Sequence, residues 1–197
     1  LGLEGTVDRL LLPDSVDDSA SEAATANLLA PFRLDRFNKD NQDVDVDQMQ
    51  RQALYPSWYA RMQTSNRPLR ERMTYFWHDH FATAQSKVQV AAYMQQQNET
   101  LRAKGLGSFR ELLLAIARDP AMLIYLDNRT NQRTAPNENY ARELMELHTL
   151  GQGNGYTETD IHEVARALTG WRIGEDGTAQ FRAAQHDAKN KTVLGLT

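Results

Sequence analysis

Hydrophobic residues recur at helical spacing along most of this chain, between recognisable helix start and stop signals. Pro68 and Pro120 stand where a proline is tolerated at the first position of a helix, and Asp119 is placed to cap the second of these helices. The segments that show helical periodicity or helix-start signals are 3–12, 48–63, 68–83, 87–104, a helix after Ser108, one from 120, 137–150 and one after Thr157. The pattern predicts an all-α protein, a multi-helix bundle of about seven to nine helices at ordinary helix lengths.

A polar stretch at 38–47 interrupts the helical pattern. Its alternating aspartates resemble the start of a calcium-binding loop, but Gln48 and Leu54 stand where such a loop requires glycine and glutamate. We therefore interpret 38–47 as a solvated linker with a helix cap at Asp47.

The pattern of hydrophobic and polar residues changes again after Trp171, where short apolar runs flank the turn Gly174–Gly177. This pattern predicts a short β-hairpin near the C-terminus. The predicted organisation is a helical domain over 1–170 followed by a hairpin and loop arm over 171–197. A two-stranded hairpin is marginally stable alone, so we expect Trp171 and Phe181 to pack it on the helical body or on a neighbouring molecule. We expect residues 183–197 to be irregular.

Charge and composition narrow the function classes. The chain has 22 Lys and Arg against 26 Asp and Glu, without a basic stripe, which argues against a nucleic-acid partner. No apolar run is long enough to span a membrane. Cysteine is absent, which excludes thiolate metal sites and a cysteine nucleophile within these 197 residues.

The predicted helix 137–150 carries an unusual load of charged residues. At about 100° per residue, Tyr140, Leu144 and Leu147 form one apolar stripe, flanked by Ala141, Met145 and His148.

Glu138, Arg142 and Glu146 follow i, i+4 spacing on another face of that helix. They could form surface ion pairs, worth roughly 0.2–0.5 kcal/mol each. Alternatively, Arg142, Glu143 and Glu146 could form a buried polar network that holds a substrate or a metal. In that case we expect Arg142 and Glu143 to be buried and paired.

Histidines supply the other candidate chemistry. His78 and His80 lie two apart on a predicted helix, so their rings point in nearly opposite directions and cannot chelate one ion together. We expect His80 to be the more buried of the two, either as a satisfied core histidine or as a metal ligand. His186 and Asp187 lie in a loop, where they could bind a metal, act as an acid–base pair beside Lys191, or belong to a polar tail.

Several motifs in a fixed order make the chain resemble the bacterial family known as domain of unknown function 1800 (DUF1800). The motifs are Phe76-Trp77-His78-Asp79-His80-Phe81, Asp127-Asn128-x-x-Asn131, the run from Pro136 to Gly151, Gly155-Tyr156-Thr157-Glu158, Ala167-Leu168-Thr169-Gly170-Trp171, and His186-Asp187-x-x-x-Lys191-x-x-Leu194-Gly195. Family members are longer, so the resemblance covers roughly the N-terminal half of such a protein and implies that a C-terminal half completes the arm.

The resemblance implies an exported or periplasmic bacterial protein, encoded near a second exported protein that would be its partner. It supplies no reaction. Our leading hypothesis is a cell-envelope enzyme whose catalytic residues are Arg142, Glu143, Glu146, His186 and Asp187. A divalent metal would suit the ligands His80, His148, Glu143 and His186. The alternative is a non-catalytic exported binding or assembly partner, in which the same cluster is structural.

Overall fold

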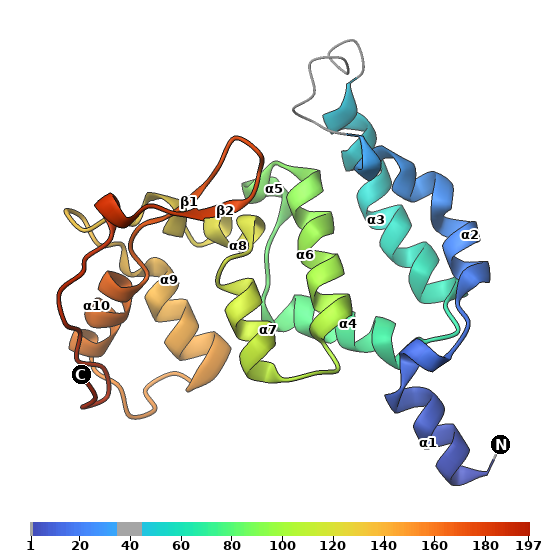
Figure 1. Cartoon of the computed structure of the whole chain (residues 1–197), viewed down its shortest axis with the longest axis horizontal. Coiled ribbons are helices and arrows are strands. Elements are labelled where there is room, and N and C mark those ends of the chain that lie inside the picture. The colour runs from blue at the N-terminus through green and yellow to red at the C-terminus, as the bar shows by residue number, and fades with distance from the viewer. Residues whose placement is uncertain (1, 35–44) are drawn as a thin grey trace. The chain divides into compact units, whose positions relative to one another are not determined.

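The computed structural model describes residues 2–34 and 45–197, which form ten α-helices and one small β-hairpin (Figure 1). The predicted all-α fold with a hairpin near the C-terminus is therefore confirmed. Contacts within the chain divide it into two compact units, unit 1 over Leu1–Ala115 and unit 2 over Ile116–Thr197. The predicted division at residue 170 falls inside unit 2, where the hairpin strand β1 contacts the helix α8.

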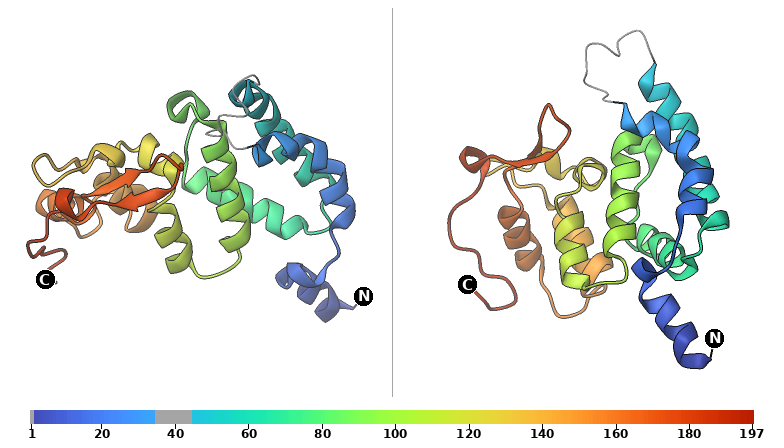
Figure 2. Two further views of the ribbon diagram at one scale, coloured as in Figure 1. Left: turned by 45° about the horizontal axis from the view of Figure 1, so that its top comes forward. Right: turned by 45° about the vertical axis from the view of Figure 1, so that its right-hand side comes forward.

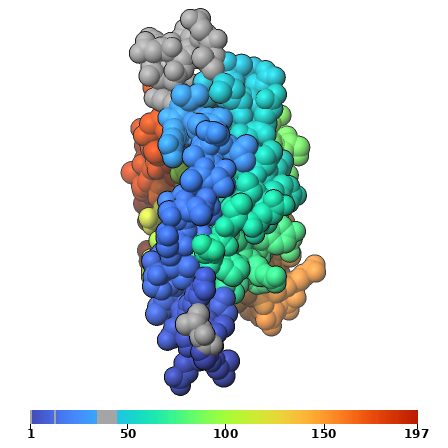
Figure 3. Space-filling view, turned by 90° about the vertical axis from the view of Figure 1, so that its right-hand side faces the viewer, coloured from blue at the N-terminus to red at the C-terminus, as the bar shows by residue number. Residues whose placement is uncertain are grey.

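Unit 1 is a bundle in which α2 lies along α3, and α6 contacts both α3 and α4. Figure 3 shows α2 and α3 side by side on one face. The largest buried side chains at its centre are Phe81, Leu54, Met94, Leu101 and Leu112. Its helices are α1 Leu3–Leu11, α2 Ser19–Leu29, α3 Val46–Thr64, α4 Pro68–His80, α5 Gln85–Val88, α6 Ala91–Lys104 and α7 Phe109–Ile116, which ends at the unit boundary, with short 3-10 turns at Pro13–Ser15 and Ala30–Arg33.

The cap of α3 differs from the prediction. Asp45 is the cap, and its carboxylate accepts the backbone N–H of Gln48 at 2.9 Å. The predicted cap at Asp47 is wrong, because the helix begins at Val46 and places Asp47 in its first turn, paired with Arg51 at 2.6 Å. Residues 38–44 of the predicted linker lie outside the described residues.

The predicted helix 87–104 is broken at Gln89. This residue has a φ of 61°, which ends α5, and α6 starts at Ala91. The sequence offers no glycine or proline here to signal a break. Arg51 of α3 donates to the Gln89 carbonyl at 2.9 Å, so a contact from a distant helix helps to hold the turn.

Unit 2 packs α9 against α10 around a small apolar core of Ala141, Met145, Ile161 and Ala165. The predicted caps are confirmed: Asp119 accepts from Met122 at the start of α8, and α10 begins with a capping box at Thr157. Its elements are α8 Pro120–Tyr125, a 3-10 turn Asn128–Thr130, α9 Glu138–Glu143, a π-helical segment Leu144–Thr149, α10 Glu158–Ala167, strands β1 Trp171–Ile173 and β2 Ala179–Phe181, and a 3-10 turn Ala183–Gln185.

The charged helix predicted over 137–150 is not uniformly α-helical. After α9, the turns of Leu144–Thr149 close as a π-helix, for example through the bond from the Leu150 N–H to the Met145 carbonyl at 2.9 Å. This wider closure changes which side chains face the core. Tyr140 is buried as predicted, but Leu147 is 63% exposed, while Met145 and His148 are buried. The predicted Tyr140, Leu144 and Leu147 stripe is therefore wrong at its C-terminal end.

The hairpin pairs Trp171 with Phe181 in antiparallel register. The two rings lie 5.4 Å apart, and the Arg118 guanidinium lies 5.3 Å from the Trp171 ring, which attaches the hairpin beside the start of α8. Both views in Figure 2 show the segment after β2 running back towards α10. Residues 183–197 are irregular, as predicted, with one 3-10 turn and no buried side chain in that described range.

Candidate functional site

Helix α10 carries two groups of charged side chains, one at each end. Glu158 lies in its first turn and Arg166 in its last, which puts them about 12 Å apart along the helix axis at 1.5 Å per residue. The predicted site residues divide between these ends. Arg142 and Glu146 join Glu158, whereas Asp187 joins Arg166.

Arg142 is the centre of the first group. Its guanidinium donates to both carboxylate oxygens of Glu158, at 3.0 and 2.6 Å, and to Glu146 at 3.4 Å. Glu138 lies 3.7 Å away and also contacts the ring of His162 at 3.0 Å. The side chain of Glu158 is 77% exposed and that of Arg142 is 36% exposed. The group is a row of ion pairs open to water, the first of the two alternatives for this helix.

Two expectations for this helix are therefore wrong. Arg142 and Glu143 are half-buried instead of buried. Glu143 also supplies none of the ion pairs of Arg142, which point to Glu138, Glu146 and Glu158. The i, i+4 spacing identified two of these partners, and the third comes from α10.

The predicted metal ligands lie on separate segments of the two units. His148 is buried in the π-helical segment, His186 lies in the loop after β2, and His80 belongs to unit 1. Across the described ranges, no group of three or more His, Asp or Glu side chains is placed to hold one metal ion.

His78 and His80 face different neighbours, as helix geometry predicts. The His80 ring lies in an aromatic cluster with Trp77 and Phe81, at 5.5 and 4.6 Å between ring centres. The His78 ring packs against Trp58 at 5.1 Å, and burial lowers its pKa below the usual value. Both histidines are half-buried, so the two do not divide into one buried and one exposed ring. The bulky ring of Trp58, from α3, covers His78.

The second charged group is more enclosed. Arg166 donates to Asp187 at 2.8 Å and, through one nitrogen, to both oxygens of Glu163 at 2.6 and 2.7 Å. The three side chains are only 14 to 16% exposed. The hydrogen bond from Arg166 and a second from the Lys189 backbone N–H hold the pKa of Asp187 far below its ordinary value. Asp187 is thus a fixed anion, and it is a poor proton acceptor.

Thr169 holds the ring of His186. The Nδ1 atom of His186 lies 2.9 Å from the Thr169 carbonyl oxygen and 3.1 Å from its hydroxyl. That hydroxyl donates to the Arg166 carbonyl at 2.6 Å and accepts the N–H of Asp187 at 2.9 Å. Its proton is committed elsewhere, so Nδ1 must carry the hydrogen and donate it. The network therefore assigns a hydrogen to Nδ1 and leaves Nε2 as the ring nitrogen free to exchange a proton.

Gly170 lets the His186 loop approach this closely. It has a φ of 94°, and a Cβ at this position would lie 3.0 Å from the Arg182 carbonyl oxygen and 3.1 Å from the His186 Cβ. The Gly170 N–H donates to the carbonyl of Asn131, which also accepts from Arg172. A residue with a side chain would push the loop away.

A pocket of about 500 Å³ opens beside His186. It is lined by Arg133, Thr134, His186, Asp187, Ala188 and Lys189. The two lining segments are joined by the bond from the Arg133 N–H to the Gln185 carbonyl at 2.8 Å. Lys191, which the sequence suggested as a charge for the site, instead donates to the Asp187 carbonyl.

Two buried asparagines shape the loop that carries Arg133. Asn131 is fully buried, donates to Asn128 and to the Ala165 carbonyl, each at 2.9 Å, and accepts the N–H of Asn137 at 2.9 Å. Through these bonds the asparagine side chains hold the backbone of the loop. Sequence reasoning missed Arg133, Lys189 and Thr169 as site residues. For Thr169 a signal existed, because it lies inside a motif that carries the family resemblance.

A family model described as "Protein of unknown function (DUF1800)" matches residues 1–197, the whole chain. A search of curated proteins and a search of solved structures each gave no match. Within the described ranges, no helix combines the length and apolar character that crossing a bilayer requires.

Proposed function

The chain belongs to this DUF1800 family, and we propose that its unit 2 is an enzyme that transfers a proton on an anionic substrate. His186 is the acid–base group, and Arg133 and Lys189 bind the anionic part of the substrate. The proposal rests on one observation: a pocket with two cations is lined by a histidine whose Nδ1 is already committed.

Fixing Nδ1 prepares the ring for proton transfer. A neutral imidazole that donates from one nitrogen can accept a proton at the other, and the donor bond sets its orientation. Here Thr169 supplies that bond from buried backbone, since its own exposure is 0%. The Nε2 lone pair is then the reactive position.

The charge balance of the pocket favours an anion. Arg133 and Lys189 form no ion pair with any residue in the described part of the chain. The one carboxylate in the lining, Asp187, is neutralised by Arg166. Arginine and lysine left without partners beside a histidine attract a carboxylate or phosphate group.

Asp187 is a positioning residue in this proposal. Its carboxylate ties the loop to Arg166, and its N–H and carbonyl are bonded to Thr169 and Lys191. It fixes His186 through the backbone and does not itself exchange protons. Arg142, Glu143 and Glu146 do not line this pocket, and Arg142 and Glu146 belong to the ion-pair row with Glu158 at the other end of α10.

We also propose that the protein acts in the cell envelope beside a second exported protein. The support is the likeness of family members to exported proteins. A non-catalytic binding or assembly role is the second candidate, and the exposed ion pairs around Arg142 favour it, because they are structural contacts.

The test is a screen for hydrolysis of anionic esters, namely phosphate monoesters and half-esters of dicarboxylic acids, in which His186 would take a proton from the attacking water, with the wild type and three variants. His186→Gln should lower kcat by about 10²–10⁴-fold, the usual contribution of a general acid–base group. Arg133→Gln should mainly raise KM. Arg129→Gln, an exposed arginine of the same unit, is the matched control and should change neither.

Equal turnover by wild type and His186→Gln would contradict the acid–base role. Anion binding that is lost in Arg133→Gln, without turnover of any ester, would favour the binding role. Activity that disappears on chelation and returns with zinc or manganese would make His186 a metal ligand.

A further inference from the structure

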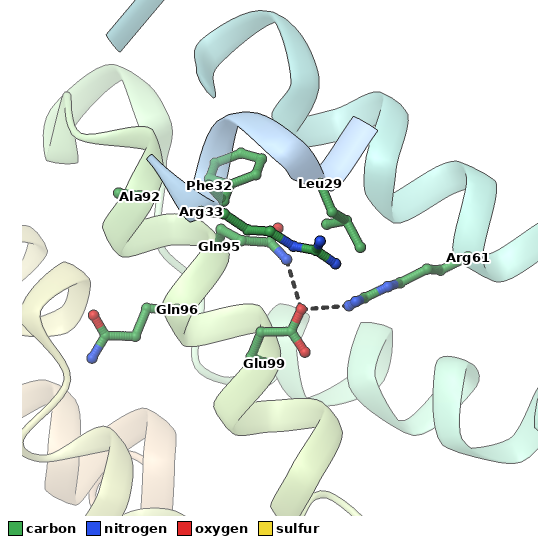
Figure 4. A pocket seen from close by; sticks show the side chains of 8 residues that line it. All are labelled: Leu29, Phe32, Arg33, Arg61, Ala92, Gln95, Gln96 and Glu99. Atoms are coloured by element: carbon green, nitrogen blue, oxygen red, sulfur yellow. Dashed lines mark hydrogen bonds and ion pairs between the residues drawn. The ribbon is translucent and has the colours of Figure 1, made fainter. Parts of the chain in front are cut away.

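Unit 1 contains a pocket of about 440 Å³, a size that suits a small organic ligand. It lies between the 3-10 turn Ala30–Arg33 and the helices α3 and α6 (Figure 4). Its lining is Leu29, Phe32, Arg33, Arg61, Ala92, Gln95, Gln96 and Glu99. No residue of this pocket belongs to the His186 site, which lies in unit 2.

The polar wall of this pocket is held in place by a continuous set of hydrogen bonds. Trp58 donates its ring N–H to the Gln95 Oε1 at 2.7 Å, and Gln95 donates to Glu99 at 2.8 Å. Arg61 donates to the same Glu99 oxygen at 2.5 Å. Both ends of the Gln95 amide and the Glu99 carboxylate are therefore committed, and the wall needs no rearrangement to receive a ligand.

Charges behind the wall are balanced. Arg102 contacts Glu99 at 3.2 Å and forms two bonds of 2.9 Å with Glu71, which is 4% exposed. Burial by itself would raise the pKa of Glu99, but Arg102 and Arg61 lower it further than burial raises it, so this carboxylate stays charged. The Arg61–Glu99 and Arg102–Glu71 pairs leave no net charge.

Arg33 is the exception. It forms no ion pair with any residue that the structure describes, and its side chain is exposed. Figure 4 shows it reaching over Gln95 beside Phe32 and Leu29. One positive charge therefore stands next to an apolar surface made by Leu29, Phe32 and Ala92.

We infer that this pocket binds a small amphiphilic anion, with its oxyanion head on Arg33 and its apolar body against Phe32, Leu29 and Ala92. The lining offers a partner for both parts. A bare inorganic anion would leave the apolar wall uncovered, and a neutral apolar molecule would make no use of the Arg33 charge. The inference does not depend on the proposed chemistry of unit 2.

The probe for this site is 8-anilinonaphthalene-1-sulfonate, whose sulfonate and aromatic rings supply both parts and whose fluorescence rises in an apolar site. Titration of the whole chain should give saturable binding. Arg33→Gln should weaken it at least tenfold, and Ala92→Phe, which fills the pocket, should abolish it. Arg72→Gln, an exposed arginine on α4, is the matched control and should bind as the wild type does.

Competition experiments test whether binding needs the apolar body of the ligand as well as its oxyanion head. Decanoate should displace the probe, and inorganic phosphate at the same concentration should not. His186→Gln should keep full binding, which distinguishes this site from that of unit 2. The inference fails if Arg33→Gln binds as tightly as wild type, if phosphate competes as well as decanoate, or if the wild type shows no saturable binding. Unchanged melting temperatures of the variants establish that the probe reports the pocket and not loosened structure.

Discussion

Thr169 shows how much of the candidate site a single residue decides. Its hydroxyl and carbonyl set the tautomer of His186 and anchor the backbone of Asp187. The sequence marked His186 and Asp187 as a loop pair with possible chemistry, but it could not assign their different roles. That assignment depends on a loop folding back across 17 residues to meet Thr169, and no local pattern encodes such a contact.

Substitution of Gly170 gives a prediction for stability, and the same substitution at Gly151 is its control. Gly170→Ala introduces a side chain at positive φ and also crowds Arg182 and His186. Gly151 has a similar φ of 90° but open space around it, so Gly151→Ala isolates the backbone cost, about 1–2 kcal/mol. We expect Gly170→Ala to cost more than this and to shift the His186 ring resonances, measured by urea denaturation and by NMR. Equal costs for the two variants would show that the loop yields without penalty.

The Asp187–Arg166 ion pair predicts that the free energy of unfolding depends on pH. The folded pKa of Asp187 is depressed, so its stabilising effect is fully present above the unfolded value of about 3.9 and is lost as the pH falls towards the folded value. Asp187→Asn should therefore destabilise at pH 7, and its difference from wild type should shrink below about pH 4. Denaturation midpoints measured from pH 7 to pH 3 test this, with the exposed Asp8→Asn as control. A pH-independent difference would mean that packing, not charge, holds the loop.

At the scale of elements, most helices and the caps at Asp119 and Thr157 followed from the sequence, whereas helix α2, the cap of α3, burial and helix type did not. Asp119 and the Thr157 capping box act through neighbours three residues away, so local sequence specifies them. The π-helical turn after Glu143 and the break at Gln89 have no local signal. They depend on how a helix meets its tertiary neighbours. The ion pairs of Arg142 could be predicted only in part. The i, i+4 spacing identifies the partners Glu138 and Glu146 on the same helix, but it does not identify Glu158 on α10.

The contrast between two helices predicts unequal mutational costs. Glu71 on α4 is 4% exposed and paired with Arg102, so Glu71→Ala leaves a largely buried guanidinium with fewer partners and should cost about 3 kcal/mol. Glu143 on α9 is half-buried and makes no pair with Arg142, so Glu143→Ala should cost less than about 1 kcal/mol. Urea denaturation followed by tryptophan fluorescence measures both. A reversed order would restore the charged helix as the centre of the site.

For the whole molecule, periodicity was sufficient to predict a helical protein with a terminal hairpin. It did not reveal the division after Ala115, because no linker composition marks that position. The boundary falls at the end of an ordinary amphipathic helix, α7. Which helices share a core is decided by packing between distant segments, and one sequence carries little information about that.

The attachment of the C-terminal segment predicts uneven hydrogen exchange. Residues 187–194 are mostly exposed, yet the N–H groups of Asp187, Thr192 and Leu194 donate to Thr169, Glu163 and Asp160. These amides should exchange more slowly than those of Glu175 and Asp176 at the tip of the hairpin. Asp160→Asn should raise the exchange rate at Leu194 and leave Asp187 unchanged. Uniform fast exchange over 183–197 would show that these bonds do not persist in solution.

The same attachment has a consequence for the order in which the two units can fold during synthesis. All of unit 1 has been synthesised once residue 115 is added, so its core can form before that of unit 2. Unit 2 is different, because some of its hydrogen bonds need residues that are synthesised later. Arg166 and Thr169 bond to Asp187, and Asp160 bonds to Leu194. At about 5–20 residues per second, the second unit remains open for roughly 4–16 s after the first can close. During that interval Arg166, Thr169 and Asp160 lack their C-terminal partners, so the polar contacts of α10 are the last of the unit to form.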